Sequence, residues 1–112
     1  MKCEAAYEKL KFYQIICEIR RRIYQLTERF PKIHMRLVSQ MRDAARSAKQ
    51  NIREGYKKGT ISEFIHSINI SRGSLEELSG DLEDCREDGL ITDKEFGELS
   101  QLCQNTDYLS AR

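Results

Sequence analysis

Apolar residues recur every three or four positions along most of the chain, and this spacing predicts amphipathic helices. A first helix is expected over about residues 7–29, because proline at Phe30-Pro31 disfavours helix at the residue before it. Its apolar positions are Phe12, Ile16, Ile19, Ile23, Leu26 and Phe30. A second helix is expected over about residues 32–56, with its apolar repeat at Val38, Met41, Ala45, Ala48 and Ile52.

The second helix is predicted to end at Gly55 or Gly59, because glycine adopts the left-handed conformation that closes a helix. A capping box, Thr60-x-x-Glu63, then opens a third helix over about residues 60–88. Ser71, Arg72, Gly73 and Ser74 interrupt the apolar stripe of that helix midway, and a tight helix crossing there would offset the cost of about 1 kcal/mol for the helical glycine. The predicted apolar stripe is Ile61, Ile65, Ile68, Leu75, Leu78, Leu82 and Cys85.

The start of a fourth helix, expected over about residues 92–107, has the clearest local signal. Thr92-x-x-Glu95 is a second capping box, and Ile91 and Phe96 occupy the positions of a hydrophobic staple. The connections between the four helices are short, so successive helices should be antiparallel neighbours. The pattern therefore predicts a single domain over residues 1–112: an all-α, up-down-up-down four-helix bundle.

Composition fits a charge-rich globular protein of one domain. Of the 112 residues, 39% are hydrophobic and 33% charged, which is too apolar for a disordered chain. No apolar run approaches the ~20 residues of a membrane span, and no signal-peptide core precedes the helices, so we expect a cytoplasmic protein. The cysteines form no C-x-x-C pair and are expected as reduced thiols: Cys85 in a core stripe, Cys17 and Cys103 beside one, and Cys3 exposed.

Charge is distributed very unevenly along the chain. Residues 1–60 contain 15 lysines and arginines against 6 acidic residues, whereas residues 61–112 contain 4 against 12. The net charge of +1 therefore hides two electrostatically opposite halves. The basic half concentrates its cations on one face of the second helix, at Arg42, Arg46, Lys49, Arg53 and Lys57, with Lys58 extending the row.

These six residues form the candidate nucleic-acid site, because cations spaced along a helix can follow a phosphate backbone. Arg20-Arg21-Arg22, with Tyr13 and Tyr24 nearby, adds to the same half of the chain. Three other interpretations remain open. Charged helix faces are usually only solvated, the acidic third helix is available to neutralise the row, and the basic half of one subunit can meet the acidic half of the next head to tail.

Catalytic and metal-binding patterns are poorly represented. A di-iron bundle uses two copies of Glu-x-x-His and two further glutamates, whereas this chain has the single copy Glu63-x-x-His66. No G-x-S-x-G occurs, and the segment GYKKGT lacks the spacing of a phosphate-binding loop. We therefore expect a protein that is not an enzyme, with no catalytic residue, no metal and no cofactor.

Several short motifs together resemble one known family, the 23S ribosomal RNA intervening-sequence proteins, over Tyr7 to Leu102. The motifs are Phe30-Pro31, Ser39-Gln40-Met41-Arg42 with Ala44-Ala45, Ser47-x-x-x-Asn51-Ile52-x-Glu54-Gly55, Glu63-Phe64, Gly73-Ser74-Leu75-x-Glu77-Leu78 and Gly89-Leu90-Ile91. Arg53 stands where the family usually has alanine, which adds charge beside the basic row.

The resemblance implies an antiparallel bundle that assembles as a ring, typically a homopentamer, and no established catalytic residues. It also implies a link to inserted segments of ribosomal RNA genes. A similar bundle occurs in accessory proteins of diversity-generating retroelements, so RNA, DNA or a protein such as a reverse transcriptase are the expected partners. Apolar positions off the main stripes, Ile15, Leu37, Phe64 and Ile70, are candidates for burial between subunits.

Overall fold

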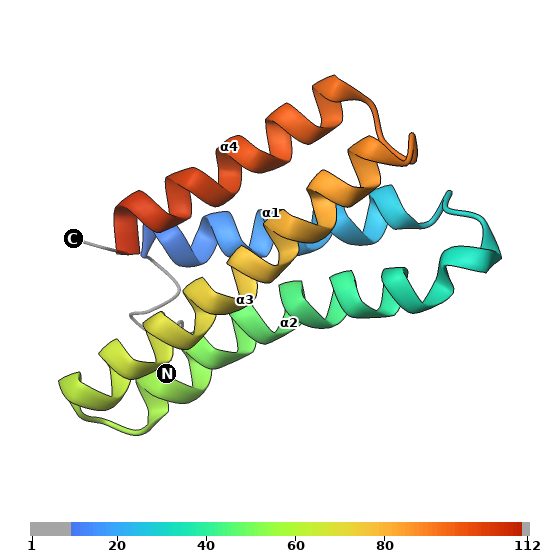
Figure 1. Ribbon diagram of the computed structural model, residues 1–112. Coiled ribbons are helices and arrows are strands. Elements are labelled where there is room, and N and C mark those ends of the chain that lie inside the picture. Colours follow the sequence, from blue (N-terminus) through green and yellow to red (C-terminus); the bar gives the residue numbers. More distant parts are fainter. Residues whose placement is uncertain (1–9, 111–112) are drawn as a thin grey trace.

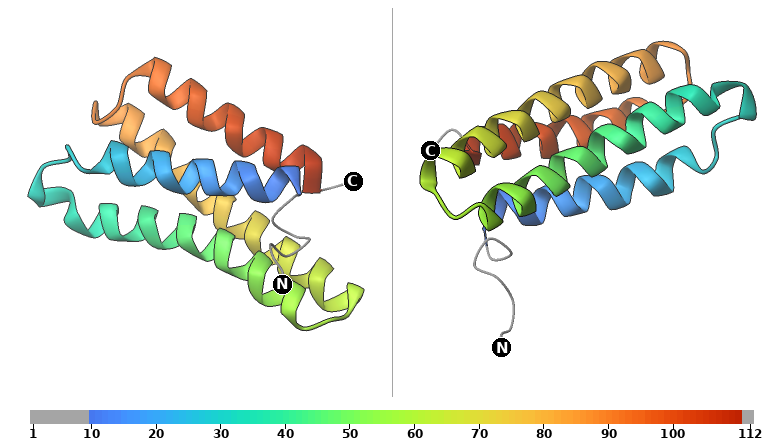
Figure 2. Two further views of the ribbon diagram at one scale, coloured as in Figure 1. Left: turned by 180° about the vertical axis from the view of Figure 1, so that it is seen from behind. Right: turned by 90° about the horizontal axis from the view of Figure 1, so that it is seen from below.

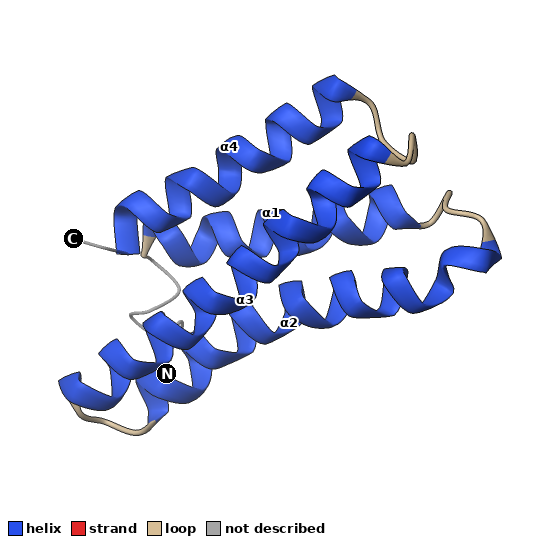
Figure 3. Ribbon diagram, in the orientation of Figure 1, coloured by secondary structure: helices blue, strands red, loops and turns tan. Residues whose placement is uncertain are grey.

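The computed structural model describes residues 10–110, and the side chains of residues 10–106. Regular structure in that range is entirely helical (Figure 3), which confirms the prediction of an all-α chain with four helices. The elements are α1 (Lys11–Thr27), a single 3-10 turn η2 (Lys32–His34), α2 (Met35–Lys57), α3 (Ile61–Glu87) and α4 (Asp93–Ser110). The predicted start of the first helix, at about residue 7, lies outside the described residues, within which α1 begins at Lys11. The second helix begins at Met35 rather than at about residue 32, because residues 32–34 form the tighter turn.

Figure 1 shows the four helices side by side, with the chain reversing direction at each connection. α1 packs against α2 and α4, and α3 packs against the same two helices, with the α2–α3 pair the most extensive. In Figures 1 and 2 the hairpin of α2 and α3 reaches beyond the ends of α1 and α4. One end of this hairpin therefore has two helices where the rest of the molecule has four.

The core consists of one stripe from each helix. The predicted apolar positions of the first helix are all buried, and those of the second are buried except Val38, which is half-buried against the core. α3 contributes Leu75, Leu78, Leu82 and Cys85, and α4 contributes Leu99 and Cys103. The 3.6-residue periodicity therefore predicts the core wherever a helix has a single apolar face.

Cysteine placement agrees with the prediction for three of the four residues. Cys85 and Cys103 are buried, Cys17 is half-buried, and all three are free thiols. Burial raises the pKa of Cys85 to about 11, because the apolar surroundings disfavour the thiolate. Its thiol is accordingly a packing group rather than a nucleophile. Cys3 lies outside the described residues.

The threonine caps the helix at both predicted capping boxes, but only the second box is complete. The amide of Glu63 donates to Thr60 Oγ1 at 3.1 Å, and the Glu63 carboxylate accepts from the same hydroxyl. At the start of α4 the exchange is reciprocal: the Glu95 amide donates to Thr92 Oγ1 at 3.1 Å, and the Thr92 amide donates to Glu95 Oε1 at 2.9 Å. The sequence signature therefore predicts the starts of α3 and α4 correctly.

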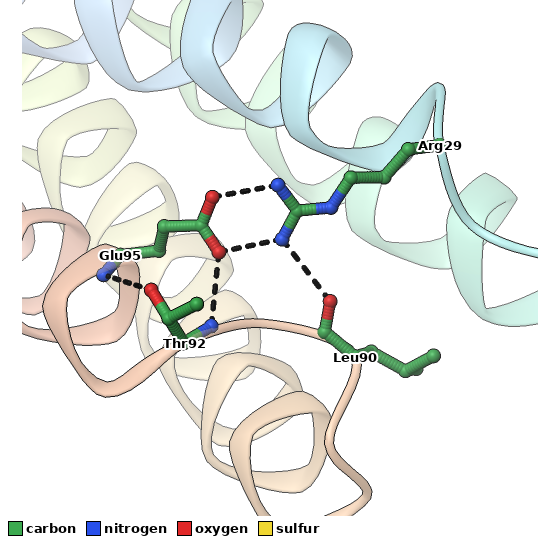
Figure 4. Close-up of polar contacts among 4 residues, drawn as sticks. All are labelled: Arg29, Leu90, Thr92 and Glu95. Carbon is green, nitrogen blue, oxygen red and sulfur yellow. Dashed lines mark hydrogen bonds and ion pairs between the residues drawn. The ribbon is translucent and has the colours of Figure 1, made fainter.

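The second box is also tied to α1 (Figure 4). Arg29 makes a bidentate ion pair with Glu95, at 2.6 and 2.5 Å, and donates to the carbonyl of Leu90 at 3.1 Å. The hydrogen bond from Arg29, followed by that from the Thr92 amide, lowers the pKa of Glu95 to about 2. One carboxylate thus caps α4 and fastens the α3–α4 connection to the end of α1.

The first half of α3 buries a different face from the one predicted. Ile61 is 80% exposed and Ile65 is 52% exposed, whereas Ser67 and Ser71 are buried. Ser71 Oγ donates to the carbonyl of Ala48 at 2.7 Å, which satisfies the buried hydroxyl. The prediction that Ile61 and Ile65 are core residues is therefore wrong, because small side chains on this face let α3 approach α2 more closely than isoleucine would.

Gly55 is the point of closest approach between these two helices. A Cβ placed on Gly55 would lie 2.2 Å from Ser67 Oγ and 2.3 Å from Ser67 Cβ. α2 passes through Gly55 and ends at Lys57, and Gly59, with φ of 86°, supplies the left-handed residue after it. Gly73 is exposed, with nothing within 4 Å of an added Cβ. The tight crossing expected at Gly73 is therefore at Gly55 instead.

A buried carboxylate in the same interface yields a prediction for stability. Asp81 is 7% exposed; Gln40 donates to its Oδ1 at 2.9 Å, and no hydrogen bond reaches its Oδ2 from the described residues. Burial raises the pKa of Asp81 above its ordinary value of 3.8, and the charges of Asp84 and Glu77 add to the effect. Folding therefore opposes ionisation of this group.

Asp81→Asn should stabilise the protein near neutral pH, on the order of 1 kcal/mol, because it removes an incompletely paired buried charge while keeping the acceptor for Gln40. The folded-state pKa is the higher one, so the folded protein binds the proton more tightly and wild-type stability falls as pH rises above about 3.8. Urea unfolding at pH 4 and pH 7 should show the advantage of the variant growing with pH. A stability advantage of the variant that is equal at both pH values would contradict a raised pKa for Asp81.

Candidate nucleic-acid interface

The predicted basic row lies along the outer surface of α2. Arg46, Arg53, Lys57 and Lys58 are exposed and Lys49 is half-buried, so five of the six predicted residues present their charge to solvent at least in part. The helical spacing places Arg46, Lys49, Arg53 and Lys57 on one side of α2, and Lys58 follows as the residue after the helix. Lys57 and Lys58 also lie at the C-terminal end of α2, where the helix dipole favours a positive charge.

These five cations have no carboxylate partner among residues 10–106. The four ion pairs in that range all use arginines of α1 or of the turn after it: Arg21 and Arg22 with Glu18, Arg22 with Glu98, and Arg29 with Glu95. α3 is rich in acidic residues and packs directly against α2, yet it forms no ion pair with the basic row within the described part of the chain. The interpretation in which the third helix neutralises the row is therefore not supported.

Arg42, the sixth residue, is held against α1. Its Nε donates to Thr27 Oγ1 at 2.9 Å and its Nη2 donates to the carbonyl of Tyr24 at 3.2 Å. The Thr27 hydroxyl donates in turn to the carbonyl of Ile23 at 2.7 Å, which leaves its oxygen free to accept from Arg42. This arginine therefore fastens α2 to α1, and two of its donor groups are turned toward the protein.

The ring of Tyr24 connects Arg42 with a second arginine. The guanidinium carbons of Arg20 and Arg42 each lie 4.7 Å from the centroid of the Tyr24 ring, a distance typical of cation–π contacts. Tyr24 and Arg20 are half-buried on α1. The basic surface thus extends from α2 onto α1, and we call Arg20, Tyr24 and Arg42 the stacked cluster.

Other candidates from the sequence lie elsewhere. Arg21 and Arg22 are engaged by Glu18, and Tyr13 is buried in the core, so these residues do not extend the basic surface as the row of three arginines indicated. Glu63 and His66 are both exposed, and within the described residues no group of three or more His, Cys, Asp or Glu side chains is placed to hold a metal ion. None of the described helices is long and apolar enough to cross a bilayer.

The four packed helices and the cationic surface define a class of small all-α proteins. The profile of one family, described as 23S rRNA-intervening sequence protein, matches residues 8–110. The chain belongs to this family, which confirms the resemblance found in the sequence motifs. A search of curated proteins finds no match to the chain.

Proposed function

We propose that this chain is a non-enzymatic nucleic-acid-binding protein that contacts phosphates of RNA or DNA through the outer surface of α1 and α2. The observation that carries the proposal is the set of five cations, Arg46, Lys49, Arg53, Lys57 and Lys58, that have no carboxylate partner among the described residues of a chain with 18 acidic residues. Phosphate contacts of this kind give affinity without reading sequence.

Salt dependence tests the proposal directly. If all five cations contact phosphates, the slope of log K against log salt should be about −4.5 for duplex DNA and about −3.5 for a single strand, since each contact releases counterions. The family description refers to sequences that interrupt 23S rRNA, so a structured RNA and a DNA duplex are the first two ligands to titrate. Affinity that does not change between roughly 50 and 200 mM salt would contradict phosphate binding.

A second candidate function is self-assembly, favoured by the isoleucines at the free end of the α2–α3 hairpin. Ile61 is 80% exposed and Ile65 is 52% exposed, and Tyr56 on α2, at 41%, lies near the same end. We propose that the up-down-up-down bundle assembles into a homo-oligomeric ring in which this apolar surface is covered by a neighbouring subunit. Exposed apolar surface of this kind commonly marks a protein contact.

The double variant Ile61→Glu, Ile65→Glu should therefore dissociate the assembly while leaving the monomer folded, because neither side chain contributes to the core. Light scattering gives the mass, and circular dichroism confirms the helices. The control, Ser62→Glu with Asn69→Glu, adds the same charge at exposed polar positions of α3 and should keep the native mass. A native protein that is already monomeric would remove this candidate.

High salt separates this apolar contact from pairing between basic and acidic surfaces. Screening weakens contacts between exposed charges, whereas burial of isoleucine is not weakened by salt. A ring held by Ile61 and Ile65 should keep its mass at roughly 1 M salt, where the Debye length is only about 3 Å. Dissociation under that condition would instead favour the head-to-tail charge pairing considered from the sequence.

A further inference from the structure

The stacked cluster of Arg20, Tyr24 and Arg42 contains groups that phosphate binding does not use. The guanidinium carbons of both arginines lie 4.7 Å from the centroid of the Tyr24 ring, so both lie close against it. Arg42 also has two donor groups occupied, by Thr27 Oγ1 at 2.9 Å and by the Tyr24 carbonyl at 3.2 Å. The Nε hydrogen and one Nη2 hydrogen of Arg42 are therefore used inside the protein, which fixes the guanidinium plane against the ring and leaves only the remaining Nη hydrogens for a ligand.

What the cluster does offer is flat, polarisable surface beside the cations. Tyr24 and Arg20 are half-buried rather than enclosed, and Arg46 stands one helical turn after Arg42 on α2. Nucleic-acid bases stack on aromatic rings and on guanidinium planes, and the phosphate of the same strand then needs a cation nearby. Arg46 and Lys49 supply that charge from the adjacent turn.

We propose that the stacked cluster receives an unpaired base, so that the ligand of the basic surface is single-stranded nucleic acid or the unpaired loop of a structured RNA. This inference rests on the proposed function and adds the class of nucleic acid. A duplex does not fit the same position, because its base faces are covered by neighbouring base pairs and only phosphates and groove edges are accessible. The cluster would then discriminate by strandedness and not by sequence.

Tyr24→Leu tests the inference, because leucine keeps apolar bulk and removes the aromatic ring without changing charge. Fluorescence anisotropy is measured with a single strand of about 12 nucleotides, within the range that one single-strand-binding module covers, and with a duplex of equal length. The variant should bind the single strand about 5- to 150-fold more weakly, the loss expected for one stacked base, with an unchanged salt slope. Duplex affinity should stay the same.

Tyr24→Phe is the matched control, since it keeps the ring and should bind both ligands like the wild type. Arg20→Gln is a second variant in case Tyr24→Leu fails to fold. Arg20 has no ion pair with a carboxylate among the described residues. Its replacement should also weaken binding of the single strand more than binding of the duplex. Thermal melting by circular dichroism confirms that each variant is folded at the assay temperature.

The outcomes separate the two proposals. Single-strand affinity unchanged in Tyr24→Leu, or equally tight binding of duplex and single strand by the wild type, would overturn base stacking and leave the cluster as a contact between α1 and α2. If binding then still falls with salt and depends on Arg46, Lys49 and Arg53, phosphate binding stands without it. If neither ligand binds at low salt, the proposed function itself fails.

Discussion

Reversing three cations of the basic row, with Arg46→Glu, Lys49→Glu and Arg53→Glu combined, should weaken nucleic-acid binding by at least about 50- to 150-fold at 0.15 M salt. The estimate follows from counterion release: each phosphate contact changes log K by about 0.7 to 0.9 per tenfold change in salt, and three contacts are removed. The slope of log K against log salt should fall in magnitude by about 2 to 3. Anisotropy titrations at several salt concentrations measure both quantities.

The fold should survive these substitutions, because none of the three residues forms an ion pair within the described part of the chain and two of them are exposed. Arg42 keeps its wild-type side chain in this variant. Its hydrogen bonds to Thr27 and Tyr24 join α2 to α1, so its reversal would disturb the packing of the helices as well as the surface charge.

A control variant distinguishes the effect of where the charges lie from the effect of the net charge. Lys32→Glu, Arg36→Glu and Lys94→Glu change the net charge by the same amount at exposed residues outside the basic row. The phosphate contacts remain in this variant, so its salt slope should stay within about one unit of the wild-type value. Equal losses in the two triple variants would show that net charge, and not the basic row, determines binding.

The positions of these cations are predictable from sequence because α2 has a simple pattern. Met41, Ala45 and Ile52 define one buried face, and the helical repeat then fixes where Arg46 and Arg53 must point. The role of Arg42 is not predictable in this way. It depends on Thr27 and Tyr24 of a different helix. The distance between α1 and α2 is set by side-chain packing, which the spacing of apolar residues along one helix does not predict.

The first half of α3 shows the same limit for the fold. Hydrophobicity favours Ile61 and Ile65 as core residues, but the buried positions are Ser67 and Ser71. Serine is a poor core residue in isolation, yet it fits here because α2 offers a glycine and an alanine opposite and a carbonyl for one hydroxyl. The fit between small side chains depends on both α2 and α3. The apolar pattern of α3 alone therefore predicts the wrong buried face.

This complementarity makes Gly55→Ala the substitution with the largest expected effect on stability. The added Cβ would lie 2.2 Å from Ser67 Oγ and 2.3 Å from Ser67 Cβ, so the two helices must move apart. Overpacking of this kind typically costs about 1–3 kcal/mol, and it outweighs the gain of about 1 kcal/mol that alanine brings to a helix interior. Urea unfolding followed by circular dichroism should show a net loss of stability.

Two further variants identify the cause of that loss. Gly73→Ala in α3 adds the same methyl group at an exposed helical position with nothing within 4 Å, so it should stabilise the protein by about 1 kcal/mol through helix propensity alone. Ser67→Gly removes the atoms that the new Cβ would meet, and added to Gly55→Ala it should recover part of the lost stability despite the cost of a second helical glycine. If Gly55→Ala stabilises the protein as Gly73→Ala does, then α2 and α3 are not in close contact at Gly55.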